Sequence, residues 1–356
     1  MAAFVAIYCL YIINNIMEAL LGKTLGELQE IVLSLGMPKF TAKQIAQWIY
    51  EKRVRSIEDM TNISKTHRAA LSSNYEVGVY DPAEAAVSKD GTIKYLFRTS
   101  SDKLVETVYI PDHDRATLCV SSQMGCKMNC YFCMTGKQGF NGHLTTAEIL
   151  NQIFAIPESL SLTNIVFMGM GEPLDNPEAV FKALEIITAP WGLAWSPKRV
   201  TVSTIGQMKH LKEYLDQSQC HLAISIHSPY PDERAQLMPV EKAFPIGQVL
   251  DLLRQYDFSH QRHLTFEYII FRGLNDDAKH AHALIKLLSG LDCKVNLIRF
   301  HAIPNVDLKT SDMTQMEKFR DILNEHGLTA TIRASRGEDI FAACGMLSSL
   351  KRNSSL

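Results

Sequence analysis

The feature that most constrains the fold is a repeated change of hydrophobic period over residues 116–333. Short apolar runs alternate there with longer runs of helical, amphipathic spacing. The runs predicted as strands are 116–121, 163–168, 199–204, 221–227, 264–271, 294–300 and 328–333. The runs predicted as helices are 146–155, 177–187, 207–216, 247–256, 276–288 and 312–326. About six consecutive strand–helix units predict an α/β fold, in which a parallel sheet with helices outside curls into a full or partial (β/α) barrel.

Residues 17–80 have a different character and predict a small helical domain. Thr24 with Glu27, and Thr41 with Gln44, have the spacing of a capping box before an apolar periodic run. The second predicted helix and its exit carry five basic residues, Lys39, Lys43, Lys52, Arg53 and Arg55. A solvated helix face and a docking face for RNA phosphates both account for this charge.

A short β segment separates that domain from the barrel. Residues 81–112 predict a β-hairpin that turns at Asp90-Gly91, because this dipeptide sits between apolar alternations. The barrel domain is then expected over 113–347, with a tail over 348–356.

Residues 1–16 form an apolar run, MAAFVAIYCLYIINNI. The run lacks the basic n-region and the small-residue cleavage site of a signal peptide. It is also shorter than the ~20 residues that span a bilayer. Because Met17 opens an ordinary amphipathic sequence, we interpret the run as an extension from a misassigned start codon that the fold does not need.

The composition indicates a soluble cytoplasmic protein with no membrane partner. Of the 356 residues, 46% are hydrophobic and 21% are charged, as in ordinary globular proteins. The net charge of −2 gives no global basic field, so any RNA partner must be bound by local basic residues. Eight cysteines without a pairing scheme indicate a reducing compartment.

Three of the eight cysteines, Cys126, Cys130 and Cys133, lie within eight residues. This packing is too tight for a disulfide framework and suits a loop that wraps one polynuclear metal centre. Zinc is the alternative, but structural zinc is nearly always closed by four ligands, and no fourth ligand lies nearby. Three thiolates predict an iron–sulfur cluster with one iron left open.

Other unusual residues fall where the predicted strands end, which is where the active site of a barrel collects. They are Gly169-Met170-Gly171-Glu172-Pro173, Ser203, Ser225, His227, His301, Asn305 and Cys344. Taken singly, each is more often a loop turn or a satisfied polar group than a functional residue.

The spacing C-x3-C-x2-C, with an aromatic residue before the last cysteine, resembles the radical S-adenosylmethionine (SAM) superfamily. The resemblance implies one [4Fe-4S] cluster on Cys126, Cys130 and Cys133, whose open iron chelates SAM. It also implies a set of SAM contacts: Phe132, Gly171, Glu172, Ser203, Ser225, Ile226, His227 and His301. At His301 this chain departs from the family, in which many members carry Asn.

Three longer motifs narrow the resemblance. They are Val105–Val108 with Arg115–Gln123, then Cys133–Phe140, then Arg336–Gly345. The chain resembles the RlmN/Cfr group of radical SAM RNA methyltransferases, from the helical domain to about residue 347. Within that group it most resembles the enzymes that methylate C2 of adenine in 23S rRNA (peptidyl-transferase region) and in tRNA (anticodon loop).

The resemblance also implies a mechanism and its residues. One SAM methylates Cys344, and the radical from a second SAM activates that S-methyl group, which adds to C2 and joins RNA to protein. Glu106 is the implied proton acceptor, and Cys119 is the implied thiol that releases the product by forming a disulfide with Cys344. The implied partners are 23S rRNA, tRNA and a flavodoxin-like electron donor, and the protein is expected to be a monomer.

Other interpretations stay open at this point. Methylation at C8 of adenine, the Cfr type, uses the same cluster and both cysteines. A metal-stabilised RNA-binding module without catalysis is the alternative from another class. Apart from the resemblance, Cys344 and Cys119 are typical of small buried hydrophobic residues, and Glu106 of an exposed strand carboxylate. Cys9, Cys220 and Cys293 match no motif and are interpreted as structural.

Overall fold

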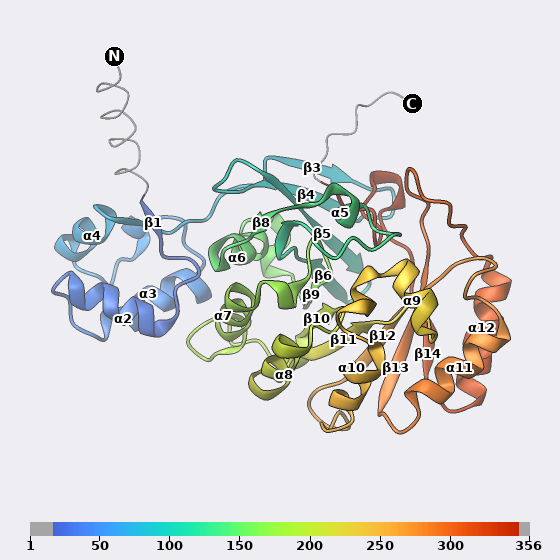
Figure 1. The fold of residues 1–356 in the computed structure, drawn as a ribbon. Helices are drawn as coiled ribbons and strands as arrows, with labels where there is room; N and C mark the ends of the chain where they lie inside the picture. Colours follow the sequence, from blue (N-terminus) through green and yellow to red (C-terminus); the bar gives the residue numbers. More distant parts are fainter. Residues whose placement is uncertain (1–16, 349–356) are drawn as a thin grey trace, which may run out of the picture. The chain divides into compact units, whose positions relative to one another are not determined.

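The computed structural model describes residues 17–348, which form two compact units (Figure 1). Of the described residues, the first unit comprises 17–80, 145–154 and 182–195, and the second comprises the remainder. The apolar run at 1–16 and nearly all of the predicted tail lie outside the described residues. Among the helices that the structure describes, none is long and apolar enough to cross a membrane.

The first unit is mainly helical, as predicted. Its elements within 17–80 are β1 (Glu18–Ala19), α2 (Leu25–Ser34), α3 (Thr41–Ala46) with a π-helical turn (Gln47–Glu51), α4 (Lys65–Ser72) and β2 (Tyr75–Glu76). The capping box at the start of α2 is confirmed: Thr24 N–H donates to Glu27 Oε2 at 2.7 Å, and Glu27 N–H donates to Thr24 Oγ1 at 3.2 Å. Helix α2 is followed by Leu35 and then by Gly36, whose φ of +70° suits glycine.

The second predicted capping box is wrong. Thr41 is the first residue of α3 and is buried, and no side chain caps this helix. The chain enters α3 through a tight turn instead, in which Thr41 N–H donates to Pro38 O at 2.9 Å. Arg53, one of the five basic residues, is half-buried with its guanidinium 4.8 Å from the ring centroid of Phe154, whereas the other four are exposed.

The second unit is built on a ten-stranded sheet, in the order β14-β13-β12-β11-β10-β9-β6-β5-β4-β3. Its parallel strands are β6 (Arg115–Cys119), β9 (Asn164–Phe167), β10 (Val200–Thr204), β11 (His221–Ser225), β12 (Leu264–Ile270), β13 (Cys293–Arg299) and β14 (Ala330–Ile332). All seven predicted strands are present. Because β14 and β3 are its two edges, the sheet is an open barrel, so the α/β prediction is confirmed in its partial form.

Helices follow most of these strands along the chain. They are α5 (Met134–Gln138), α6 (Thr146–Phe154), α7 (Pro177–Thr188), α8 (Met208–Gln217), α9 (Pro231–Leu237), α10 (Ile246–Leu253), α11 (Ala278–Leu288) and α12 (Met313–Glu325). The six predicted helices correspond to α6, α7, α8, α10, α11 and α12. Short 3-10 turns lie at Ile57–Asp59, Pro157–Leu160, Pro173–Asp175, Pro197–Arg199, Pro239–Lys242 and Glu338–Ile340.

The predicted hairpin is present and belongs to the same sheet. Strands β3 (Glu84–Val87) and β4 (Ile93–Arg98) pair antiparallel across the turn at Asp90-Gly91. Strand β5 (Leu104–Asp112) pairs with β4 and then with β6, with Val108 opposite Cys119. The hairpin therefore extends the barrel sheet at the side of its first parallel strand.

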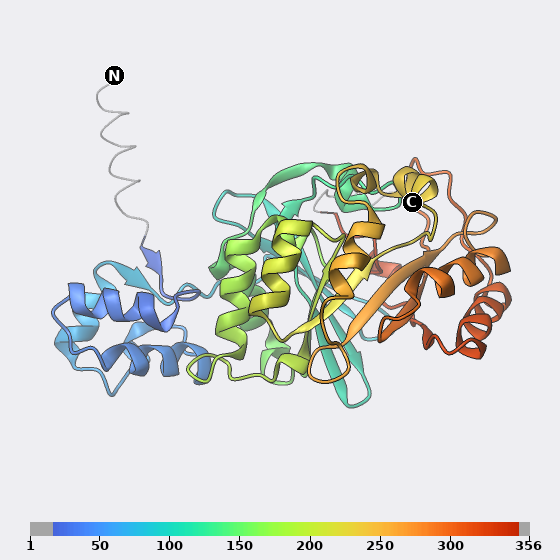
Figure 2. The same cartoon turned by 60° about the horizontal axis from the view of Figure 1, so that its bottom comes forward.

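The two faces of the sheet have different neighbours. Figures 1 and 2 show α8, α10, α11 and α12, yellow to red, along one face. On β12, Tyr268 points to this side and stacks on Phe319 of α12, with ring centroids 5.3 Å apart. Because side chains alternate along a strand, the flanking Glu267 and Ile269 point the other way and line a cavity.

Candidate active site

The cavity on the inner face of the sheet collects most of the residues singled out in the sequence. Its lining includes the predicted cluster cysteines and most predicted SAM contacts: Cys126, Cys130, Cys133, Phe132, Gly171, Glu172, Ser203, Ser225 and His227. It also includes Cys119 and Cys344. Three predicted residues do not line it: Glu106, Ile226 and His301.

The loop of the three cysteines is shaped by close backbone contacts. It runs from β7 (Gln123–Gly125) to α5, and β8 (Phe140–His143) then pairs back onto β7. Cys126 N–H donates to Gly139 O at 3.1 Å. At Gly125, where φ is +81°, a Cβ atom would lie 1.7 Å from the same oxygen, so only glycine fits. The chain thus closes a small ring around the cysteines.

The donor set fits a polynuclear cluster better than a single ion. In the described part of the chain, no three Cys, His, Asp or Glu side chains are grouped to hold one metal ion. The three thiols instead share one cavity wall with Met128 and Phe132. Burial raises the pKa of Cys126 to about 12 and the pKa of Cys130 well above its ordinary value. Thiolates here therefore need a positively charged centre beside them.

The loop after β9 brings a buried carboxylate to the cavity. Gly171 has a φ of +102°, and a Cβ atom there would lie 2.6 Å from Gln123 Cβ. The close approach turns Glu172 inward, where its carboxylate accepts hydrogen bonds from Thr204 Oγ1 at 2.5 Å and from Ile205 N–H at 3.0 Å. Burial raises the pKa of Glu172 to about 7 despite these bonds. A ligand ammonium group would favour the charged form.

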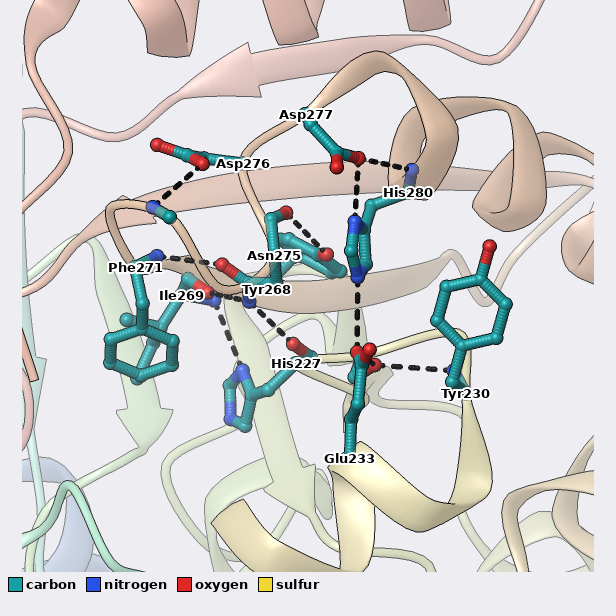
Figure 3. Close-up of polar contacts among 12 residues, drawn as sticks. His227, Tyr230, Glu233, Tyr268, Ile269, Phe271, Asn275, Asp276, Asp277 and His280 are labelled. Carbon is teal, nitrogen blue, oxygen red and sulfur yellow. Dashed lines mark hydrogen bonds and ion pairs between the residues drawn. The ribbon is translucent and has the colours of Figure 1, made fainter.

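His227 is presented to the cavity as a neutral donor. It follows β11 in a left-handed conformation, with φ of +55°. Its Nδ1 accepts a hydrogen bond from Ile269 N–H at 3.1 Å (Figure 3), which places the ring proton on Nε2. Burial, assisted by Arg234, lowers the pKa of His227 to about 3. The imidazole therefore stays neutral at physiological pH and can donate through Nε2–H.

Asn275, which is fully buried, holds this arrangement in place (Figure 3). Its Nδ2 donates to His227 O at 2.7 Å and to Ile269 O at 2.8 Å. Its Oδ1 accepts from Phe271 N–H at 2.7 Å. The side chain thus links the end of β11 to the end of β12 through three backbone groups.

We expect Asn275→Ala to lower the free energy of unfolding by about 2–4 kcal/mol. Three buried backbone groups lose their hydrogen-bond partner, and each unsatisfied group costs ~1–3 kcal/mol. Water that enters the space left by the side chain would offset part of this cost. Urea denaturation of the variant and the wild type measures the change. Asn141→Ala, at an exposed position of β8, is the control and should be neutral. An unchanged denaturation midpoint for Asn275→Ala contradicts the linking role.

Cys119 and Cys344 line the cavity together with a cation that the sequence did not single out. Cys119 is buried at the end of β6, and Cys344 is exposed in the segment after β14. Burial and, as a smaller effect, the nearby Cys344 thiol raise the pKa of Cys119 to about 12, whereas Arg333 lowers it. Arg333 lies 3.9 Å from Glu267 Oε2, and the two thiols with Glu267 raise the pKa of its guanidinium. Arg333 therefore favours the thiolate form of Cys119 and partly offsets the effect of burial.

The segment that carries Cys344 docks onto the helix that follows the cysteine loop. Met134 N–H donates to Gly345 O at 2.8 Å, and Thr135 Oγ1 donates to Leu347 O at 2.8 Å. These contacts fix the distal cysteine beside the cavity that the loop cysteines line. The sequence motifs contained Thr135 and Gly345 but gave no sign that they meet.

The three predicted residues outside the cavity have other neighbours. Glu106 is buried on β5, pairs with Lys94 Nζ at 2.9 Å and accepts from Ser348 N–H at 2.7 Å. Ile226 is fully buried. His301 lines a second cavity, which adjoins the first at Cys344.

Two residues were missed by sequence reasoning, Arg333 and Asn275. Each follows a predicted strand or lies on its end, and that position is the one signal that would have included them. Neither belongs to a recognisable motif.

Comparison with known families agrees with this site. Residues 120–285 match the family model described as the radical SAM superfamily. Residues 18–77 match the model described as the ribosomal RNA large subunit methyltransferase N-terminal domain. The first match contains the cysteine loop and the strand ends up to His227, and the second corresponds to the helical part of the first unit.

Whole-chain relatives are close. A protein of Parabacteroides distasonis named "Probable dual-specificity RNA methyltransferase RlmN" is 64% identical over 93% of this chain and 97% of its own length. The "Dual-specificity RNA methyltransferase RlmN" of Solidesulfovibrio magneticus is 41% identical over 93% and 96%. The crystal structure of a radical SAM methyltransferase from Sphaerobacter thermophilus superposes with a TM-score of 0.88 at 38% identity, covering 94% of this chain and all of the other. The chain belongs to the RlmN family of the radical SAM superfamily.

Proposed function

We propose that this cytoplasmic enzyme methylates C2 of adenine in 23S rRNA, in the peptidyl-transferase region, and in tRNA, in the anticodon loop. The observation that carries the proposal is the shared cavity: Cys119 and Cys344 line it together with the three loop cysteines. The relatives' names support the RNA substrate, because they are dual-specificity RNA methyltransferases.

The chemistry requires a carrier because adenine C2 is electron-poor and cannot displace a methyl group from SAM. Cys126, Cys130 and Cys133 would hold a [4Fe-4S] cluster. When bound, SAM would supply the methyl group, and the cluster together with SAM would supply the radical that activates it. Glu172 suits the SAM ammonium group, and His227, which lines the same cavity, can donate a hydrogen bond through Nε2–H. An external flavodoxin-like protein supplies the electrons, and the enzyme acts as a monomer.

Cys344 is the methyl carrier in this proposal, and Cys119 releases the product. The Cys119 thiolate attacks the Cys344 sulfur, forms an S–S bond and breaks the bond from that sulfur to the carbon on adenine. The carbon keeps the electron pair and takes a proton to become the methyl group. Before this exchange the C2 proton leaves to a base and the unpaired electron of the adduct leaves as well, which the cluster would accept when bound. The disulfide is reduced before the next turnover.

Glu106 is proposed as that base. Its carboxylate is held by Lys94 and by Ser348 N–H, so the role requires the C-terminal segment to move when RNA binds. Ser348 lies just beyond Cys344 in sequence, so the movement that frees the carboxylate also shifts the methyl carrier.

The position of methylation distinguishes the proposal from its enzymatic alternative. RNA treated with the reconstituted enzyme should contain 2-methyladenosine, measured by mass spectrometry of nucleosides against synthetic standards. Formation of 8-methyladenosine alone would place the activity at C8. No methylated adenosine from a protein that retains iron and sulfide would reject both.

A further inference from the structure

A second cavity adjoins the active-site cavity. The two share a wall formed by Ile110, Ile298, Arg333, Ala342, Ala343 and Cys344. Beyond this wall, the second cavity is lined mainly by polar and charged side chains: Asp112, Arg115, Thr117, His301, Ser335 and Arg336. Cys344 therefore lines two cavities, one that also holds the predicted cluster cysteines and one that also holds Arg115 and Arg336, with Arg333 in the shared wall. We call the second space the arginine cavity.

The charge of the arginine cavity is positive. Arg336 pairs with Asp112 at 2.9 Å, and Arg333 lies 3.9 Å from Glu267, so each has an acidic neighbour. Arg115 is exposed and makes no ion pair with any residue in the described range 17–348. One guanidinium is thus left to meet an anion from outside.

The remaining wall supplies hydrogen-bonding groups. His301 is 5% exposed, and its Nε2 lies 3.0 Å from Ser335 Oγ. Its Nδ1 lies at ion-pair distance, 3.2 Å, from Glu338 Oε1 and makes no hydrogen bond within the described residues. His301 and Ser335 therefore give this side of the cavity polar groups that can meet a polar ligand.

A ribonucleotide phosphodiester has the chemistry that this cavity recognises. Guanidinium groups contact phosphate oxygens through paired N–H donors, and hydroxyl groups of Thr117 and Ser335 add single donors. A target adenosine must leave its stack to be reached, which carries its flanking phosphates into the protein. With the base at Cys344, the arginine cavity adjoins it across the shared wall.

We propose that the arginine cavity binds the phosphodiester beside the target adenosine, with Arg115 as its principal contact. The inference rests on the proposed function, because that function supplies the RNA. It adds that RNA and SAM approach Cys344 from opposite sides of one wall.

Salt-dependent binding tests this assignment. The RNA is a stem-loop whose loop contains the adenosine that the enzyme is proposed to methylate. It is titrated with wild type, Arg115→Gln and Arg115→Lys over a series of KCl concentrations. We expect Arg115→Gln to bind less tightly and to lower the slope of log K against log salt by about 0.7, the value for one phosphate contact on a single strand. Arg115→Lys keeps the charge and should keep the slope. Arg98→Gln, an exposed arginine on β4 that lines neither cavity, is the control.

A neutral phosphate locates the contact. Two RNAs each carry a single methylphosphonate, one on the 5′ side and the other on the 3′ side of the target adenosine. One of these two RNAs should bind the wild type less tightly than the unmodified RNA does, and should bind Arg115→Gln as tightly as the unmodified RNA does. Equal slopes for wild type and Arg115→Gln, or equal losses for both at every methylphosphonate, overturn the inference. Methylation of the RNA by wild type is measured in parallel. If methylation persists, the proposed function stands whatever the binding result; if it is absent, the proposed function itself fails.

Discussion

Cys119→Ala is expected to accumulate a covalent protein–RNA adduct, and Cys344→Ala is expected to form none. Cys344 is the proposed methyl carrier, so its loss stops the reaction before any bond to RNA forms. Cys119 acts only afterwards, as the thiol that attacks the Cys344 sulfur. Both side chains line the active-site cavity, so this exchange needs no third thiol.

A denaturing gel with labelled RNA measures the adduct. The retarded band should appear for Cys119→Ala and be absent for Cys344→Ala and for the double variant. Cys220→Ala removes a buried cysteine outside the cavity and should behave like wild type. Turnover by Cys119→Ala at the wild-type rate, or methylation by Cys344→Ala, would show the two-cysteine mechanism to be wrong.

The pKa of Cys119 gives this step a pH dependence. Burial raises that pKa to about 12, so the thiol is almost fully protonated at neutral pH. Below the pKa the thiolate fraction rises about tenfold for each pH unit, so the rate of adduct release should rise with pH until another step limits turnover. An adduct release rate that is constant from pH 7 to pH 9 would indicate a different resolving group.

Cys130→Ala is expected to lose its iron and sulfide and all cleavage of SAM. Three thiolates are the only protein ligands proposed for the cluster. Removing one leaves two ligands, which are too few to retain the cluster in the protein. Iron and acid-labile sulfide analysis of anaerobically purified protein, with the absorbance of the cluster, measures the loss. Assay of 5′-deoxyadenosine release measures the cleavage.

A matched cysteine variant separates cluster loss from misfolding. Cys293 is the first residue of β13 and lies outside both cavities. The variant Cys293→Ala should therefore have the same iron content as the wild type. Full iron in Cys130→Ala would reject the ligand assignment. One zinc ion per wild-type chain, with no sulfide, would favour the metal-stabilised RNA-binding module.

Much of the fold was predictable because buried parallel strands are apolar and continuous. All seven parallel strands and the six longer helices lie within a few residues of their predicted positions. The missed elements of the second unit are short: β7, β8 and α5 have three to five residues and α9 has seven, too few to show a clear period. The pairing of β5 with β6, in the interior of the sheet, was also missed, because strand pairing depends on contacts that local pattern does not encode.

The site was predictable to the extent that strand order alone determines it. Parallel strands end at the same edge, so Glu172, Ser225 and His227 were expected together and lie together. His301 also follows a strand, yet it points into the neighbouring cavity, because the direction of a loop side chain depends on loop geometry. Arg333 escaped notice because a single arginine near a strand end has no distinguishing pattern.

The docking of the Cys344 segment onto α5 has a consequence for biosynthesis. The hydrogen bond from Thr135 to Leu347 spans 212 residues, so it forms only when nearly the whole chain has left the ribosome. The loop's hydrogen bond from Tyr131 N–H to Leu237 O can form much earlier, because both residues precede the C-terminal segment. Chains terminated before Gly345 would keep the loop but lack both contacts to α5. The order of synthesis thus completes the wall that carries Cys344 last.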